Sequence, residues 1–433
     1  MIDSFHISNF KSFIKAEMHL APLTFLIGPN ASGKSNLIEA IRILAWLAKG
    51  GRLDDIERTF LGSDSLVRGK TNDLFKKANE VLELGCRISG VIEDWNSLSI
   101  EVGLFNENLI LRNERVYKED ETISLYQIDG QPSVHSDEIS VMYNNFKKGK
   151  NKPHIPCSNR QAVFYQLETP SRFNSEKSQK IIPSVTKSFR TKLRNVIFLD
   201  PHPGAMRAYA WAKDDEIMED GKNLSSVLYK ICKDDRLKAK MLDFIRSLPE
   251  QDIKDIRFIE TDRNDVMVRL VESFGDEERM MDAPLLSDGT LRVLAIGATL
   301  LSAQEGSLVI VEEIDNGVHP SRAESLIRQI RHIIETRNLQ VLLSSHNPAL
   351  LDALPDESLG DVLCCYRDQT QGDSRVVRLQ DLERYPELVA MGPLGQAMTK
   401  RILDRFIKDK TTRQERSEDA LAWLDEFKKE VSK

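Results

Sequence analysis

Hydrophobic and polar residues alternate with two different periods along the chain. Residues 2–13 mix apolar and polar residues in alternation and residues 23–27 form a short apolar run, and both patterns are typical of strands. Residues 36–48 then place apolar side chains at helical spacing. The pattern predicts a strand, a glycine-rich loop and a helix over residues 23–48.

Two later regions differ from each other in the same way. From about residue 81 to 128 the chain forms short alternating segments with turn residues between them, which predicts an antiparallel sheet. In the last third, helices predicted at residues 290–302 and 320–336 alternate with strands at 308–311 and 340–344. This rhythm implies a parallel sheet covered by helices. We therefore predict an α/β fold that combines a parallel sheet with an antiparallel β lobe.

The stretch between these regions lacks a clear period and is rich in lysine and arginine. We interpret it as an inserted basic arm of helices and long loops, which divides the protein into four parts. These are the N-terminal part of a head (1–141), the arm (142–194), the C-terminal part of the head (195–375) and a charged helical extension (376–433). Near its end, the extension carries four apolar residues at helical spacing, which favours a core-packing helix over a docking helix. They are Leu421, Trp423, Leu424 and Phe427.

Composition narrows the class of protein. With 41% hydrophobic and 29% charged residues, the 433-residue chain is globular rather than disordered. A net charge of -7 excludes bulk electrostatic binding of nucleic acid, so any DNA contact must be local. The five cysteines form no CxxC pair, and no apolar run reaches the roughly eighteen residues of a membrane span. We expect a cytoplasmic protein that does not contact a membrane.

The most specific motif follows the apolar run at residues 23–27. The segment GPNASGKS fits G-x-x-x-x-G-K-[ST] between a predicted strand and a predicted helix. Its glycines let backbone N–H groups curl around phosphates, and the helix N-terminus favours negative charge. We expect Lys34 to reach the β- and γ-phosphates of ATP and Ser35 to ligate Mg²⁺. The predicted nucleotide-binding residues are Gly28, Pro29, Asn30, Ala31, Ser32, Gly33, Lys34, Ser35 and Asn36.

Two adjacent carboxylates end the apolar strand predicted at residues 308–311. Glu312 and Glu313 would lie at the carboxyl edge of the parallel sheet, where ligands of such sheets bind. We assign Glu312 to the Mg²⁺ shell and Glu313 to activation of the attacking water. A strand that runs into an acidic surface turn would look the same, but the phosphate-binding motif in the same chain favours catalysis.

Two further segments have both a structural and a functional interpretation. Ser287 or Asp288 fits an ordinary helix N-cap, whereas Ser287 and the Gly289 amide could instead donate to a γ-phosphate held by another subunit. The position of this segment just upstream of the paired carboxylates favours function. His346 ends the next strand, thirty-three residues after Glu313, where it can reach a γ-phosphate. A histidine at a strand end is otherwise structural.

The order of these motifs resembles that of a known family. GPNASGKSN, LSDGT, VIVEEIDNGVHP and SSHNPALLD are similar to the Walker A, signature, Walker B with D-loop, and H-loop motifs of ABC-type ATPases. The opening HISNFKSF is similar to the first strand of the SMC, RecF and OLD branch. FLDPHPGAMRAY and EDGKNLSSVLYKI resemble the stand-alone ATPase subunits of bacterial antiphage defence systems such as PARIS and Septu. The resemblance covers about residues 1–352.

The resemblance implies an ABC-ATPase head that hydrolyses ATP with Mg²⁺, using Lys34, Glu313 and His346. It also implies that two heads sandwich two ATP molecules, with Ser287 and Gly289 facing the other head and Asp315 coupling the two sites. Two positions depart from the commonest pattern: Glu312 stands where Asp is usual, and Asp288 stands where the transporter signature has Gly. Gln166 is a candidate for the Q-loop glutamine.

The expected partners follow from the nuclease motifs that the sequence lacks. It contains no D-x-D pair for a TOPRIM nuclease and no H-x-x-H cluster, so we predict no intrinsic nuclease. The first hypothesis is a homodimeric or larger regulatory ATPase of antiphage defence that controls a separate effector, expected to be a nuclease. The alternative is a RecF- or SMC-like repair ATPase that clamps DNA. The lysines of the arm that would serve as its DNA-binding patch are Lys147, Lys148, Lys150 and Lys152.

Overall fold

The structure is a computed structural model of the 433-residue chain. It describes residues 1–56, 66–77, 80–105, 108–130, 137–149, 151–246, 252–274, 277–316, 320–392, 394–399 and 406. The predicted helix around Trp423 lies outside these residues. Within the described ranges, no helix is both long enough and apolar enough to cross a membrane.

One mixed sheet of fourteen described strands runs through most of the molecule, in the order β10-β15-β16-β3-β17-β18-β2-β1-β4-β5-β6-β7-β8-β9. Strands β10 to β17 of this order pair in parallel, and the strands from β2 to β9 pair antiparallel. The strands are β1 (Ile2–Phe10), β2 (Phe13–His19), β3 (Leu23–Ile27), β4 (Leu82–Ile88), β5 (Ser97–Phe105), β6 (Asn108–Tyr117), β7 (Tyr126–Asp129), β8 (Glu138–Tyr143), β9 (His154–Ser158), β10 (Val196–Leu199), β15 (Leu308–Val311), β16 (Gln340–Ser345), β17 (Val362–Arg367) and β18 (Ser374–Arg378). The predicted α/β fold with a parallel sheet and an antiparallel lobe is confirmed.

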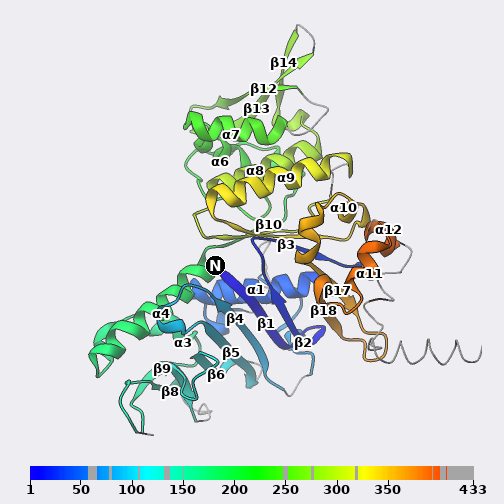
Figure 1. The fold of residues 1–433 in the computed structure, drawn as a ribbon. Helices are drawn as coiled ribbons and strands as arrows, with labels where there is room; N and C mark the ends of the chain where they lie inside the picture. The colour runs from blue at the N-terminus through cyan, green and yellow to red at the C-terminus, as the bar shows by residue number, and fades with distance from the viewer. Residues whose placement is uncertain are drawn as a thin grey trace, which may run out of the picture.

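Helices cover both faces of the parallel strands. Figure 1 shows α1 on one side of these strands and α8 and α9 on the other. The longer helices are α1 (Lys34–Ala48), α4 (Glu176–Arg194), α6 (Leu224–Ile231), α7 (Asp235–Arg246), α8 (Asp288–Ser302) and α9 (Pro320–Arg337); the short ones are α3 (Val163–Gln166), α5 (Pro203–Met206), α10 (Pro348–Asp352), α11 (Tyr385–Ala390) and α12 (Leu394–Thr399). Because the parallel strands are covered twice, their sequences are continuously apolar; every residue of β15 and β3 is buried.

A second, smaller sheet lies in the lobe that carries α6, α7 and α8 (Figure 1). It consists of β11 (Ala210–Trp211), β12 (Ile253–Glu260), β13 (Asp265–Phe274) and β14 (Glu277–Asp282). Its buried residues belong to the same hydrophobic cluster as those of α8 and α9, whereas α1 and α4 contribute to a separate cluster with the antiparallel strands. The parallel sheet therefore separates two hydrophobic cores.

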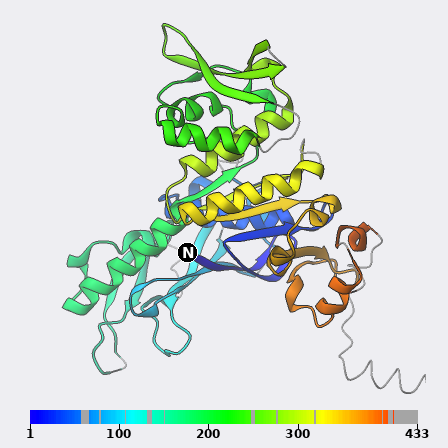
Figure 2. The same ribbon diagram turned by 45° about the horizontal axis from the view of Figure 1, so that its top comes forward.

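The stretch at residues 142–194, which we expected to be an arm of helices and long loops, contains the nineteen-residue helix α4, whose bounds the sequence did not predict. Ser175 caps this helix by accepting a hydrogen bond from the Ser178 N–H at 3.2 Å. Its inward face, which includes Ile182 and Phe189, is fully buried, and the helix packs against α1. Figures 1 and 2 place α4 at the same end of the molecule as β8 and β9. The polar outer face and the internal Pro183 had obscured this amphipathic helix in the sequence.

A buried carboxylate connects the antiparallel sheet to the chain that leads into α4. Glu114 of β6 is fully buried and accepts hydrogen bonds from the Tyr126 hydroxyl at 2.8 Å, the Val163 N–H at 2.7 Å and the Phe164 N–H at 2.6 Å. Burial raises the pKa of Glu114 to about 7, although these three donors oppose the shift. The side chain thus satisfies the first N–H groups of α3.

Candidate active site

The glycine-rich loop lies between β3 and α1, as predicted. Gly33 adopts φ 115° at the N-cap of α1, and no side chain caps the helix. A Cβ at Gly28 would lie 2.2 Å from the Cys365 carbonyl oxygen, and a Cβ at Gly33 would lie 2.6 Å from Ser374 Oγ. Both positions therefore require glycine, the first because of close approach and the second because of its positive φ as well. The uncapped helix N-terminus leaves its N–H groups available to an anion.

The Lys34 side chain folds back over the loop. Its Nζ donates to the carbonyl oxygen of Gly28 at 2.7 Å and to that of Pro29 at 3.2 Å. Burial lowers the pKa of Lys34, and the negative charges of Glu313 and Asp315 nearby oppose this shift. The electrostatic coupling shows that the loop and the segment after β15 share one site.

The paired carboxylates at the end of β15 have different environments. Glu312 is half-buried, and its Oε1 accepts a hydrogen bond from Arg42 Nη2 at 3.1 Å. Glu313 is exposed, adopts φ 49°, and receives a hydrogen bond from the Asn316 side-chain amide. The Glu313 N–H donates to Ser344 Oγ at 3.0 Å, which joins this turn to the end of β16. Positive φ at a non-glycine residue is strained backbone of the kind found at functional sites.

Asp315 and His346 meet at the same edge of the sheet. The Asp315 Oδ2 atom lies 3.6 Å from His346 Nδ1, and the Asp315 side chain is only 6% exposed. Among the described residues, Asp315 Oδ1, His346 Nδ1 and Ser32 Oγ are buried polar atoms with no hydrogen-bond partner in the protein. Such atoms are rare and require an explanation. A phosphate group offers the acceptor that the Ser32 hydroxyl lacks, so this donor and the Lys34 ammonium fit a bound nucleoside triphosphate.

Arg42 was not predicted as a site residue. Its guanidinium bridges Glu312 and Glu219 and stacks on the Phe198 ring, with 4.6 Å between Cζ and the ring centroid. Burial raises the pKa of Glu312 to about 7, Arg42 opposes this shift, and the neighbouring Asp200 and Glu219 add to it. Ser35 and Arg42 are seven residues apart on α1 and therefore lie on the same helix face. This spacing could have indicated in the sequence that Arg42 faces the site.

The residues predicted to hold Mg²⁺ are Ser35 and Glu312. Ser35 lies half-buried in the first turn of α1, and Glu312 currently pairs with Arg42. Mg²⁺ in nucleotide sites takes one or two protein ligands and several phosphate oxygens. A hydroxyl and a carboxylate are a suitable donor set for the ion, and the surplus of carboxylates around Arg42 favours a cation here.

Asn36 and Ser32, two of the predicted nucleotide-binding residues, also form contacts that hold the loop in place. The Asn36 side-chain amide donates to Ser12 Oγ at 2.8 Å, and Ser374 Oγ donates to the same hydroxyl at 2.8 Å. The Cys365 thiol donates to the Ser32 carbonyl oxygen at 3.2 Å. Strands β17 and β18 therefore support the loop from the side, and the sequence analysis did not find either strand.

The LSDGT segment lies at the start of α8. Ser287 Oγ accepts from the Thr290 N–H at 3.1 Å, so Ser287 is an N-cap in the isolated chain, and Ser287 and Asp288 are exposed. Arg207 donates to Asp288 Oδ1 at 2.5 Å and to the Leu286 carbonyl oxygen at 3.1 Å. The acid at the unusual signature position is therefore neutralised by an arginine from the FLDPHPGAMRAY segment. Whether Ser287 and Gly289 also face a nucleotide on another head remains a prediction.

Gln166, the Q-loop candidate, is used locally. Its Oε1 accepts from the Ser158 N–H at 2.8 Å, and its Nε2 donates to the carbonyl oxygens of Ser158 and Gln161 at 2.9 and 2.8 Å. These bonds hold α3 against β9 and leave the amide no free donor or acceptor pointed at a ligand. The structure gives Gln166 a structural role.

Comparison with known proteins identifies the domain. A family model described as "AAA domain, putative AbiEii toxin, Type IV TA system" matches residues 23–352, which include the loop, the carboxylates and His346. The chain belongs to this AAA-domain family. The chain is also similar, with 37% identity over 81 residues, to the DNA replication and repair protein RecF of Leptospira interrogans serogroup Icterohaemorrhagiae serovar Lai (strain 56601). That match covers 18% of this chain and only 22% of RecF.

The chain is also similar to solved structures of SMC heads. An SMC head bound to the C-winged helix domain of ScpA matches with a TM-score of 0.50 and 12% identity, covering 89% of this chain and 99% of that head. The SMC head domain from Thermotoga maritima matches with a TM-score of 0.40 and 13% identity, covering 87% of this chain and 98% of that domain. The first likeness confirms the predicted head fold of the AAA-domain protein.

Proposed function

We propose that the protein is an ATP-hydrolysing molecular switch of antiphage defence that controls a separate nuclease effector. The observation that carries the ATPase part is the meeting of Lys34, Glu313, Asp315 and His346 at one edge of the parallel sheet, beside an uncapped helix N-terminus. Residues from three separated motifs converge there. Such convergence is what phosphoryl transfer requires, because it depends on positioning and charge stabilisation.

Each residue has a role that its contacts permit. Lys34 can exchange its bonds to the Gly28 and Pro29 carbonyls for bonds to phosphate oxygens. Glu313 is exposed and oriented by Asn316, so its carboxylate can accept a proton from the attacking water. His346, held near Asp315, can donate to the γ-phosphate. Mg²⁺, when bound through Ser35 and Glu312, would neutralise phosphate charge.

The switch part of the proposal concerns how hydrolysis is coupled to a partner. Ser287 and Asp288 are exposed, and they begin a helix whose N-terminus is free to face a second head. A homodimer that sandwiches ATP between Ser287 and Gly289 of one head and Lys34 of the other would assemble only in the ATP state. The description of the family as a putative toxin of a toxin–antitoxin system supports a defence role.

Phosphate release and mass by light scattering test the ATPase switch. Lys34→Ala should abolish ATP turnover, since the β- and γ-phosphates lose their cation. Glu313→Gln should bind ATP, hydrolyse it at least tenfold more slowly and prolong the assembled state. Undiminished turnover in Glu313→Gln would overturn the assignment of the base.

Co-expression of the wild-type protein with its genomic neighbours, followed by phage challenge, tests the defence role separately. Full protection by the Lys34→Ala variant would contradict the proposal that ATP drives the switch.

The similarity to RecF favours a second candidate, a DNA-clamping repair ATPase. Of the arm lysines, Lys147 and Lys148 are exposed, Lys150 lies outside the described residues, and Lys152 is buried with its Nζ donating to the Lys147 carbonyl oxygen at 2.8 Å. The available patch is therefore smaller than the sequence indicated. Salt-dependent DNA binding that is lost in Lys147→Gln/Lys148→Gln would support this function.

A further inference from the structure

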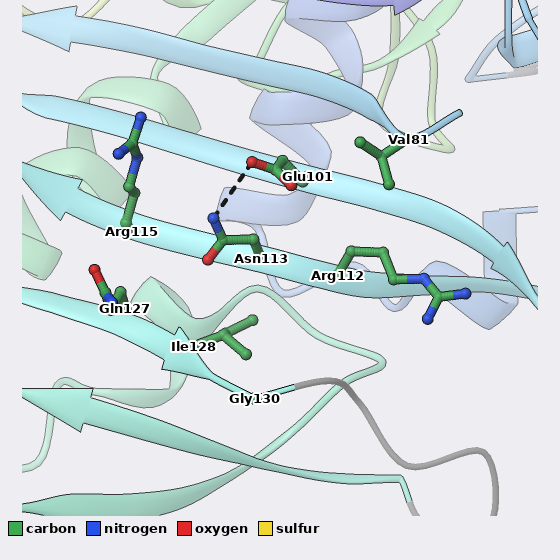
Figure 3. A pocket seen from close by; sticks show the side chains of 8 residues that line it. All are labelled: Val81, Glu101, Arg112, Asn113, Arg115, Gln127, Ile128 and Gly130. Atoms are coloured by element: carbon green, nitrogen blue, oxygen red, sulfur yellow. Dashed lines mark hydrogen bonds between the residues drawn. The ribbon is translucent and has the colours of Figure 1, made fainter. Parts of the chain in front are cut away.

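The outward face of the antiparallel sheet contains a hollow of about 750 Å³ on the strands β5, β6 and β7 (Figure 3). Its lining combines charged, amide and apolar side chains. The residues are Val81, Glu101, Arg112, Asn113, Arg115, Gln127, Ile128 and Gly130. None of them takes part in the candidate active site, so the hollow needs a separate explanation.

A β-bulge gathers the polar side chains on this face. The pairing of β5 with β6 shifts between Glu101 and Val102, which face Asn113 and Leu111, so Arg112 is the extra residue. Leu111 and Glu114 are buried, whereas Arg112 and Asn113 are partly exposed and Arg115 is exposed. Without the bulge, strict alternation would place Arg112 on the same face as Glu114, in the core. The bulge therefore directs two arginines and an amide to one surface.

Gly103 makes room for one of these arginines. A Cβ at Gly103 would lie 2.7 Å from Arg112 Nε and 2.8 Å from its Cγ, so the arginine side chain lies across the position that any other residue would fill. Figure 3 shows the two guanidiniums at opposite ends of the hollow, with the Asn113–Glu101 hydrogen bond between them. The shape of the hollow thus depends on a missing side chain and on the bulge together.

This face carries two arginines and two glutamates, and both glutamates already have partners within the protein. Glu101 accepts from Asn113 Nδ2 at 3.3 Å, and Glu83 accepts from Ser99 Oγ at 2.6 Å and lies 3.7 Å from His6 Nε2. In contrast, neither Arg112 nor Arg115 forms an ion pair with any residue that the structure describes; Arg112 donates only to the Leu104 carbonyl oxygen, at 3.4 Å, and Arg115 stacks on the Tyr117 ring. Besides His6, Arg115 acts on Glu83 at longer range and helps to lower the pKa of that carboxyl. Both guanidiniums thus keep donors for carboxylates, the ligands that their planar shape matches.

We propose that this hollow binds an extended acidic segment of a partner protein, with Arg112 and Arg115 as the anion-binding side chains. The two arginines are three residues apart on one strand, roughly 10 Å. They match acidic side chains three positions apart in an extended segment of polyproline II conformation, in which every third side chain points the same way. Asn113 and Gln127 offer amide donors and acceptors for its main chain, and Val81 and Ile128 offer apolar contact. The apolar side chains of Val81 and Ile128 in the lining favour a peptide over a phosphodiester backbone.

Fluorescence anisotropy at low ionic strength tests the proposal with a labelled peptide of four Glu-Ser-Ser repeats and the matching Gln-Ser-Ser peptide. The full chain should bind the glutamate peptide at least tenfold more tightly than the glutamine peptide. Arg112→Gln/Arg115→Gln should weaken that binding about tenfold or more. The control Lys180→Gln/Lys187→Gln removes the same charge from exposed positions on α4 and should change binding less than twofold.

A second variant keeps the charge and alters only the shape of the hollow. Gly103→Ala should displace Arg112 and weaken binding of the glutamate peptide severalfold, with unchanged circular dichroism as the check on folding. Equal losses in the two double variants, or binding that survives the arginine changes, would overturn the proposal. Arginine-dependent binding of a labelled single-stranded oligonucleotide that the peptide cannot displace would assign the hollow to nucleic acid. Phosphate release from the same preparations separates this outcome from a failure of the ATPase assignment.

Discussion

Two buried carboxylates at opposite ends of the large sheet, Glu114 and Glu312, have similar pKa values and different surroundings. Burial raises the pKa of each to about 7. Glu114 in the antiparallel lobe is fully buried and receives three hydrogen bonds from neutral donors. Glu312 at the parallel edge keeps 19% of its side chain exposed, pairs with Arg42 and lies near the acids Asp200 and Glu219.

This difference in surroundings distinguishes Glu114, a carboxylate with a structural role, from Glu312, a carboxylate of the candidate site. Glu114 accepts the hydrogen bonds of three buried donors, so its removal leaves these donors without a partner. Glu312 lies among like charges that a single guanidinium balances incompletely, an arrangement that a bound cation relieves. A shifted pKa by itself therefore does not identify a functional residue, whereas the sign of the neighbouring charges does.

The largest expected effect is on stability, from Glu114→Ala. The substitution leaves the Tyr126 hydroxyl and the N–H groups of Val163 and Phe164 unpaired, and each unpaired buried donor costs about 1–3 kcal/mol. We expect the free energy of unfolding in urea to fall by about 3 kcal/mol or more. Glu312→Ala is the matched control and should lower it by less than about 1 kcal/mol, because it relieves repulsion. Equal losses of unfolding free energy in the two variants would contradict the distinction between Glu114 and Glu312.

The pH dependence of stability sharpens the assignment of Glu114. Its folded pKa of about 7 lies above the ordinary value of 4.5, so the folded protein favours the protonated carboxyl. Its stabilising contribution is full below pH 4.5 and is lost as the pH rises through 7. Glu114→Gln removes this titration. The stability of the wild-type protein relative to Glu114→Gln should therefore decrease between pH 4.5 and 7 in urea unfolding; a constant difference would contradict the raised pKa.

The next effect concerns activity. Arg42→Ala removes the guanidinium that opposes the raised pKa of Glu312, so this carboxyl becomes protonated at neutral pH and binds Mg²⁺ poorly. Phosphate release at pH 7 should fall about tenfold, which corresponds to roughly 1.4 kcal/mol, and should partly recover at higher pH or higher Mg²⁺ concentration. Arg42→Lys should retain most activity. Equal activity of Arg42→Ala and wild type at every pH would show that Arg42 only supports the fold.

The smallest stability effect distinguishes a cap from a site residue. Ser287→Ala and Ser175→Ala each remove the N-cap of a helix, α8 and α4 respectively, and each should cost about 1 kcal/mol in urea unfolding. Only Ser287→Ala should also slow phosphate release, by at least tenfold, if Ser287 donates to ATP on a second head. Similar turnover in the two variants would leave Ser287 as a cap.

Strong local patterns predicted their elements well. The strand at residues 308–311 is β15 with the same bounds, and the helix expected at residues 320–336 is α9 (Pro320–Arg337). The glycine-rich loop could be placed between β3 and α1, because its φ values and close contacts require particular residue types at fixed spacing. These features depend on nearest neighbours along the chain.

Other elements depend on contacts between distant segments and escaped prediction. Helix α4 has a low content of apolar residues and becomes stable through packing on α1. Strand β17 pairs with β3, more than three hundred residues earlier in the sequence, and its Cys365 then supports the phosphate-binding loop. Similarly, Arg42 and Glu312 are 270 residues apart. No local pattern encodes such partners.

The sequence by itself therefore determined which groups make up the candidate site: a glycine-rich loop, two carboxylates and a histidine, each at the end of a predicted strand. These depend on residue type and short spacing, which the chain carries locally. Only the tertiary structure decided which groups are paired: Arg42 with Glu312, Arg207 with Asp288, and Glu114 with α3. Charge and hydrogen-bond balance depend on distance in space, and folding alone sets that distance.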